Sequence, residues 1–124
     1  MTVYCDDARI LKGRAAYSHL WADSMPELLA MADRIGLKRK WLEKPPKARW
    51  VHFDILPRQR TLAIAYGAVL TDKYGPLEHE ARGKLKSPDP ERAAEAQRDI
   101  DRIEALRIRD RKGCGPAPVQ EKLL

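Results

Sequence analysis

Long apolar runs are missing from this chain, and only two of its 124 residues are cysteines. A membrane-spanning helix needs about 20 consecutive apolar residues, and no stretch of the sequence approaches that length. The first residues also lack the charged-then-apolar layout of a signal peptide. Cys5 and Cys114 are too far apart in sequence to suggest a disulfide framework or a zinc site. We therefore expect a cytoplasmic protein without a membrane partner.

Acidic residues are scarce between positions 34 and 60, where nine Lys or Arg residues stand against only Glu43 and Asp54. The whole chain carries a formal net charge of +6. Such a basic cluster favours phosphate-bearing partners, and it is equally typical of a solvated surface that keeps a small domain soluble. A nucleotide or nucleic acid is the partner that the first alternative predicts.

The clearest local signal predicts a helix over residues 25–35. Ser24 is a good N-cap residue, Glu27 follows it at capping-box spacing, and Pro26 suits the first turn. Gly36 then ends the helix.

Strands are predicted on either side of a loop in the N-terminal region. The stretch "TVYCDD" is rich in β-branched and aromatic residues, and "SHLWAD" alternates in the manner of a strand. Between them, "ARILKGRAAY" has no clean periodicity and is predicted to be a loop.

Further along the chain, "RWVHFDI" reads as an extended segment and "LPRQRTLAIAYG" as a helix that begins near Pro57. The stretch "AVLT" predicts a third strand. After Asp72 the composition becomes highly charged, and a long helix is expected from about residue 90 to 111. Its thin apolar stripe consists of Ala93, Ala96, Ile100, Ile103 and Leu106.

These elements predict an α/β fold: a small sandwich of a short sheet with two helices, plus a long C-terminal helical extension. We expect an α/β domain at 1–72, the helical extension at 73–112 and a flexible tail at 113–124. A lone helix with a thin stripe is marginal in water. It should therefore pack on the α/β domain or on a second copy, and a homodimer through this helix is the favoured alternative.

Histidine and aspartate recur at the predicted strands. If "RWVHFDI" is extended, His52 and Asp54 project from the same face. The first predicted strand ends at Asp6 and Asp7, and His19 lies near the start of the second. The candidate catalytic residues are Asp6, Asp7, His19, His52 and Asp54. Imidazole and carboxylate together suit a divalent metal such as Mg, Mn or Zn, and the candidate ligands are Asp6, His52 and Asp54. A hydrogen-bonded structural His–Asp pair is the alternative.

Basic and aromatic residues could bind the phosphates and bases of a nucleotide. The candidate phosphate-binding residues are Arg9, Lys38, Arg39, Lys40, Arg58 and Arg60. Trp41 and Trp50 could stack on bases, or simply pack beneath a loop.

Five motifs in order, "VYCDDARI", "HLWAD", "ELLAMADRIGLKRKW", "HFDI" and "LAIAYGAV", resemble those of a family of small bacterial and phage proteins, domain of unknown function 4031. The resemblance covers about residues 1–70. Cys5 stands where an aliphatic residue is expected, which affects packing rather than chemistry. The resemblance implies a cytoplasmic protein of bacterial or phage origin whose working part is its first 70 residues, and it implies no substrate.

Three functions remain open at this point. The leading hypothesis is a small metal-assisted hydrolase that acts on a phosphoester of a nucleotide or nucleic acid, which requires the His and Asp residues to converge. A non-catalytic nucleotide- or nucleic-acid-binding module requires only a continuous basic surface. A phage accessory or inhibitor protein that docks through its C-terminal helix requires an exposed stripe around Ile100 and Ile103.

Overall fold

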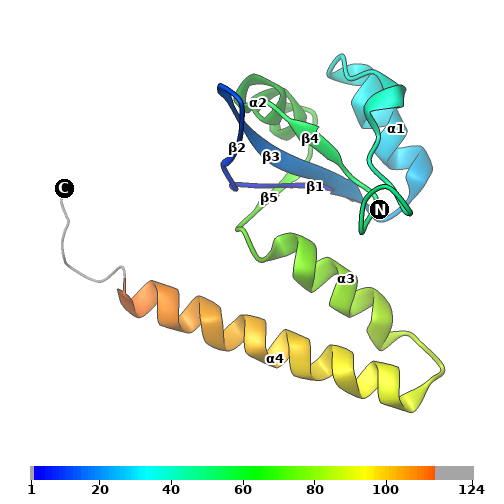
Figure 1. The fold of residues 1–124 in the computed structure, drawn as a ribbon, viewed down its shortest axis with the longest axis vertical. Coiled ribbons are helices and arrows are strands. Elements are labelled where there is room, and N and C mark those ends of the chain that lie inside the picture. The colour runs from blue at the N-terminus through cyan, green and yellow to red at the C-terminus, as the bar shows by residue number, and fades with distance from the viewer. Residues whose placement is uncertain (1, 114–124) are drawn as a thin grey trace. The chain divides into compact units, whose positions relative to one another are not determined.

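The computed structural model describes residues 2–113 (Figure 1). The chain divides into two compact units, the first ending at Pro76 and the second beginning at Leu77. The predicted tail lies, from residue 114 onward, outside the described residues. Within residues 2–113, no helix is both long enough and apolar enough to cross a membrane.

The first unit is built on a sheet that the described residues form from five strands. These are β1 (Val3–Asp6), β2 (Ile10–Lys12), β3 (Ala15–Ala22), β4 (Phe53–Ile55) and β5 (Val69–Thr71). β3 is antiparallel to β1, β2 and β4, and β1 is parallel to β5. The three predicted strands are confirmed, and the segment "RWVHFDI" is extended only from His52, which forms a β-bridge with Glu43, through β4.

The loop predicted at "ARILKGRAAY" is wrong, because β2 and the start of β3 form a hairpin there. Lys12 pairs with Ala15 across a two-residue turn, in which Gly13 has a φ of 63°. The left-handed conformation of this turn suits glycine. All three residues of β2 are exposed, so the strand has no buried face and shows no alternation of apolar and polar residues.

Two helices border the sheet, as predicted. In α1 (Met25–Arg34), the Ser24 hydroxyl accepts a hydrogen bond from the Glu27 amide at 3.4 Å and donates one to its carboxylate at 2.8 Å. α2 (Pro57–Ala65) begins at the proline that the sequence indicated. Between α1 and β4 lie a short 3-10 helix, η1 (Arg39–Trp41), and an irregular loop.

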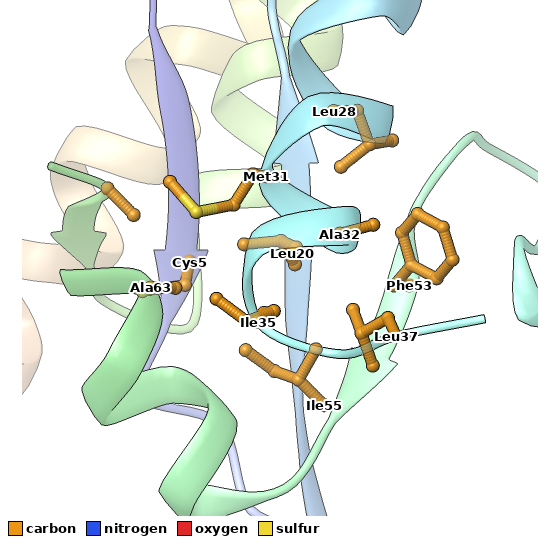
Figure 2. Close-up of a cluster of buried hydrophobic side chains, with 11 residues drawn as sticks. Cys5, Leu20, Leu28, Met31, Ala32, Ile35, Leu37, Phe53, Ile55 and Ala63 are labelled. Carbon is orange, nitrogen blue, oxygen red and sulfur yellow. The ribbon is translucent and has the colours of Figure 1, made fainter. Parts of the chain in front are cut away.

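The hydrophobic core lies between one face of the sheet and these two helices (Figure 2). Cys5, Leu20 and Phe53 are neighbours across β1, β3 and β4, and all three are fully buried. They pack with side chains from α1, α2 and the segment after α1, namely Leu28, Met31, Ala32, Ile35, Leu37 and Ala63. Because side chains alternate along a strand, the residues next to these core positions point to the opposite face of the sheet. That opposite face carries the histidines.

The helical extension comprises α3 (Gly75–Leu85) and α4 (Pro90–Gly113). The Arg107 guanidinium of α4 pairs with the Glu78 carboxylate of α3 at 2.9 Å. Ala96, Ile100 and Ile103, the centre of the predicted stripe, are buried in the single chain. In this conformation they are not available to a second copy, so the burial gives no support to a dimer through the stripe.

Candidate metal centre and basic cleft

The register of three strands gathers the histidines and aspartates on one face of the sheet. His19 of β3 is the direct partner of Asp54 of β4, and Tyr4 of β1 is the partner of Trp21 of β3. Asp6 lies two residues after Tyr4, and His52 lies two residues before Asp54, so both project from the same face as His19. The convergence that the hydrolase hypothesis requires is present.

Within the described residues, His19, His52 and Asp54 form a group that could hold a metal ion. Each offers one ligand atom, and these atoms all lie within 4.8 Å of one another. His52 is buried, and the other two side chains are partly buried. Two imidazoles and one carboxylate form a ligand set typical of zinc and of non-haem iron, with coordination positions left open.

Hydrogen bonds at Nδ1 orient both imidazole rings toward this centre. His19 Nδ1 lies 2.7 Å from Asp6 Oδ2, and His52 Nδ1 lies 3.0 Å from the Trp50 carbonyl oxygen. A carboxylate and a carbonyl can only accept, so in both rings Nδ1 carries the proton. When neutral, a ring with its proton on Nδ1 has its lone pair on Nε2, as metal-ligating histidines do. Burial lowers the pKa of His52, which favours the neutral form that a metal requires.

The closest contact within the group is between two hydrogen-bond acceptors. His52 Nε2 lies 3.4 Å from Asp54 Oδ1, and with the ring proton on Nδ1 neither atom has a hydrogen to share. The two atoms repel each other unless a cation or a proton lies near both. In tetrahedral zinc sites with bonds of about 2.0–2.2 Å, neighbouring ligand atoms are about 3.3–3.5 Å apart. The observed separation therefore fits two ligands of one ion.

Asp6 orients His19. Its carboxylate is fully buried, and Oδ1 accepts hydrogen bonds from the amides of His19 at 2.9 Å and Ala8 at 3.2 Å. The sequence prediction named Asp6 as a ligand, but the structure places it behind His19, and His19 takes that place in the group. Asp7 is exposed and lies outside the group.

Trp50 and Glu43 hold His52 in place. The Trp50 ring stacks on the His52 ring, with centroids 4.2 Å apart and planes 15° apart. The backbones of Glu43 and His52 exchange two hydrogen bonds, of 2.9 and 3.0 Å, which close the loop between them. Trp50 therefore packs on a candidate ligand, and its stacking on a base stays a prediction.

A cleft of about 460 Å³ adjoins the candidate metal centre through Asp54. Its lining is strongly basic and includes Lys12, Tyr17, Leu37, Lys40, Trp41, Glu43, Lys47, Asp54, Leu56, Arg58 and Gln59. Clefts of a few hundred cubic ångströms are the size that binds small organic ligands. A phosphate in this cleft would lie among several cations and next to the carboxylate of the metal centre.

The structure places only two of the six predicted phosphate-binding residues in the cleft. Lys40 and Arg58 line the cleft. Arg39 pairs with Asp33 at 2.8 Å, and Arg60 donates a hydrogen bond to the Ser18 hydroxyl at 3.1 Å, so both have structural partners.

The remaining two predicted cations, Lys38 and Arg9, are exposed and do not line the cleft. Lys38 Nζ lies 5.5 Å from the centroid of the Trp41 ring. Trp41 does line the cleft and is 48% exposed, as a residue that stacks on a base would be.

Sequence reasoning missed two lysines of the cleft. Lys12 lies in the hairpin that was predicted to be a loop, so nothing indicated its proximity to Asp54. Lys47 belongs to the basic run between residues 34 and 60, but nothing distinguished it from its neighbours there. The positive charge of this run predicted a basic surface. Which of its residues line the cleft depends on the path of the loop, which the sequence does not show.

A comparison with protein families places most of the chain in a known family. The family model described as "Protein of unknown function (DUF4031)" matches residues 3–82, which include the whole metal centre and every residue named in the lining of the cleft. The match agrees with the resemblance seen in the motifs and extends past residue 70. No curated protein and no solved structure matches the chain.

Proposed function

The chain belongs to the DUF4031 family, and we propose that it is a metal-dependent hydrolase acting on a phosphoester of a nucleotide or nucleic acid. One observation carries the proposal: two imidazole nitrogens and a carboxylate oxygen converge where a basic cleft begins. Phosphoryl transfer needs a metal ion together with cations that neutralise the charge on the phosphate. This arrangement offers both within one face of a small sheet.

Each group in the proposed site has a distinct role. His19, His52 and Asp54 are the ligands, and Asp6 keeps the His19 ring in the orientation and tautomer that binding requires. A divalent ion held by these three residues would supply Lewis acidity toward a phosphoryl oxygen and would lower the pKa of a water molecule at the site. Lys40 and Arg58 bind the phosphate. The nitrogen ligands favour zinc, manganese or iron over magnesium, which prefers oxygen.

The proposal is tested by metal-dependent hydrolysis. The protein is stripped with a chelator, reloaded with zinc, manganese or magnesium, and assayed on bis(p-nitrophenyl) phosphate and on single-stranded oligonucleotides. We expect activity with zinc or manganese that is lost in His52→Gln and Asp54→Asn. His79→Gln and Asp7→Asn make the same chemical changes outside the metal centre and should retain activity. Absence of turnover with all three metals, or full activity in His52→Gln, contradicts the proposal.

A binding module without catalysis is the second candidate, and the exposed Trp41 in a basic cleft favours it. In that case a single-stranded oligonucleotide should bind without any metal, with an affinity that falls steeply with salt because phosphate contacts release counterions. Trp41→Leu should weaken binding, whereas the exposed Leu11→Ala should not. Binding that is insensitive to salt and to Trp41 contradicts this candidate.

We also propose that the protein works in the cytoplasm. Cys5 is a free, fully buried thiol in the core. Unpaired thiols are usual in reducing compartments. Localisation of a tagged chain in a bacterial host tests this point, and recovery in the periplasm contradicts it.

A further inference from the structure

Lys12 connects the metal centre with the basic cleft. Its Nζ lies 2.5 Å from Asp54 Oδ2, and it also lines the cleft. The Lys12 side chain is 56% exposed and the Asp54 side chain 18% exposed. A lysine with a mostly exposed side chain therefore contacts a mostly buried carboxylate of the cleft wall.

The two oxygens of Asp54 face different partners. Oδ1 lies beside His52 Nε2, and Oδ2 accepts the hydrogen bond from Lys12. The ammonium group thus already neutralises the carboxylate that a metal ion would use. A metal that binds Asp54 takes over this role, and the attraction that keeps Lys12 on Asp54 falls.

Lys12 is able to leave. An ion pair whose lysine is more than half exposed contributes little. A divalent ion held by two imidazoles and the same carboxylate would outcompete it. The flexible four-carbon stem of a lysine allows Nζ to swing over several ångströms. Once released, the side chain remains charged at neutral pH because the ordinary pKa of a lysine is about 10.4.

We propose that Lys12 is a positioning residue that moves from Asp54 to the substrate phosphate when the metal binds. The inference rests on the proposed function, since it assumes a metal at His19, His52 and Asp54 and a phosphate in the cleft. The released ammonium group joins Lys40, Lys47 and Arg58 around that phosphate. Metal and phosphate then bind cooperatively, and by linkage each raises the affinity for the other by the same factor.

Equilibrium binding to two probes tests this coupling. Cobalt(II) is titrated by its absorption spectrum and adenosine 5′-monophosphate by calorimetry, each with and without the other, on the full chain. The variants are Lys12→Gln, Lys12→Arg and Lys47→Gln. Lys47 is the matched control because it is a lysine of the same cleft whose contacts do not include Asp54.

We expect Lys12→Gln to bind cobalt about threefold to fivefold more tightly than the wild type, since the ion no longer displaces an ammonium group. Its cobalt–nucleotide coupling should fall by about fivefold. Lys12→Arg should restore the coupling. Lys47→Gln should weaken nucleotide binding equally with and without cobalt and leave cobalt affinity unchanged. Unchanged coupling in Lys12→Gln, or the same tightening of cobalt in Lys47→Gln, overturns the inference.

Failure of the inference is distinguishable from failure of the hydrolase proposal. The titrations measure binding only, so the expected coupling without any phosphoester cleavage supports the role of Lys12 and overturns the hydrolase. If His52→Gln binds cobalt as tightly as the wild type, the ion is held elsewhere, and both the metal centre and the role of Lys12 are overturned. Circular dichroism of each variant checks that the fold is retained.

Discussion

His19 and Asp54 are direct partners across the antiparallel strands β3 and β4, although 34 residues separate them in the sequence. This pairing puts an imidazole and a carboxylate on one face, and it puts Leu20 and Phe53 in the core on the other. A slip of one residue in the register would exchange the two faces. The hydrophobic core therefore fixes the geometry of the candidate metal centre.

Asp6→Asn should weaken the metal centre without removing a ligand. An asparagine side chain has only one acceptor oxygen, so it cannot accept hydrogen bonds from both the backbone amide and the ring of His19 as the carboxylate does. The ring of His19 then loses its orienting partner. We expect zinc affinity to fall by about 10- to 100-fold and the free energy of unfolding to fall by about 1–3 kcal/mol. Competition with a chromogenic chelator and urea denaturation measure the two effects. Asp7→Asn, at the exposed neighbour, is the control, and an equal effect there would show that Asp6 has no special role.

The stability of the metal-free protein should depend on His52 below neutral pH. Burial lowers the pKa of His52 in the folded chain below its ordinary value of 6.5. As the pH falls, His52 is therefore protonated in the unfolded chain before it is protonated in the folded chain. The contribution of His52 to the free energy of unfolding is present above pH 6.5 and is lost as the pH falls through the folded-state pKa. Urea denaturation at pH 7.5 and at pH 5.5 should show a smaller loss for His52→Gln than for the wild type. Equal losses would mean that other groups account for the pH dependence.

Truncation of Leu20 should be far more costly than truncation of Leu11. Leu20 is fully buried between β1 and β4, whereas Leu11 in β2 is 77% exposed. Leu20→Ala removes apolar burial and leaves a cavity, so we expect a loss of about 2–5 kcal/mol in the free energy of unfolding. Leu11→Ala should stay within about 0.5 kcal/mol of the wild type. Denaturant titration of both variants measures the difference, and similar values would contradict the placement of the core.

Ser24→Ala should remove the N-cap of α1. The hydroxyl contacts both the amide and the carboxylate of Glu27. We expect a loss of about 1 kcal/mol in the free energy of unfolding. Thr61→Ala is the matched control inside α2, where the hydroxyl donates to the Pro57 carbonyl oxygen and alanine has the higher helix propensity. A loss in Thr61→Ala as large as that in Ser24→Ala would contradict the capping role.

The helices were predictable because their signals are local. Ser24, Pro26 and Gly36 bound α1 within a few residues of one another, and Pro57 stands at the first position of α2. The period of two in "RWVHFDI" also predicted that His52 and Asp54 share a face, because alternation in an extended chain needs no tertiary information. The motifs pointed to the correct family for the same reason, since they are short stretches read in order.

The composition of the site was decided by pairings that are distant in sequence. His19, not Asp6, lies in the group that could hold a metal ion, because the Asp6 carboxylate turns back to the amide and ring of His19, which are 13 residues further along the chain. Lys12 reaches Asp54 across 42 residues, from a strand with no buried face to mark it. Lys40 and Arg58 line the cleft, whereas Arg39 and Arg60 bind Asp33 and Ser18. The sequence by itself determined which residue types were present and which neighbours shared a face. Only the tertiary structure decided which of several similar charged residues lie at the site. Their positions depend on strand register and loop path, which local propensities do not encode.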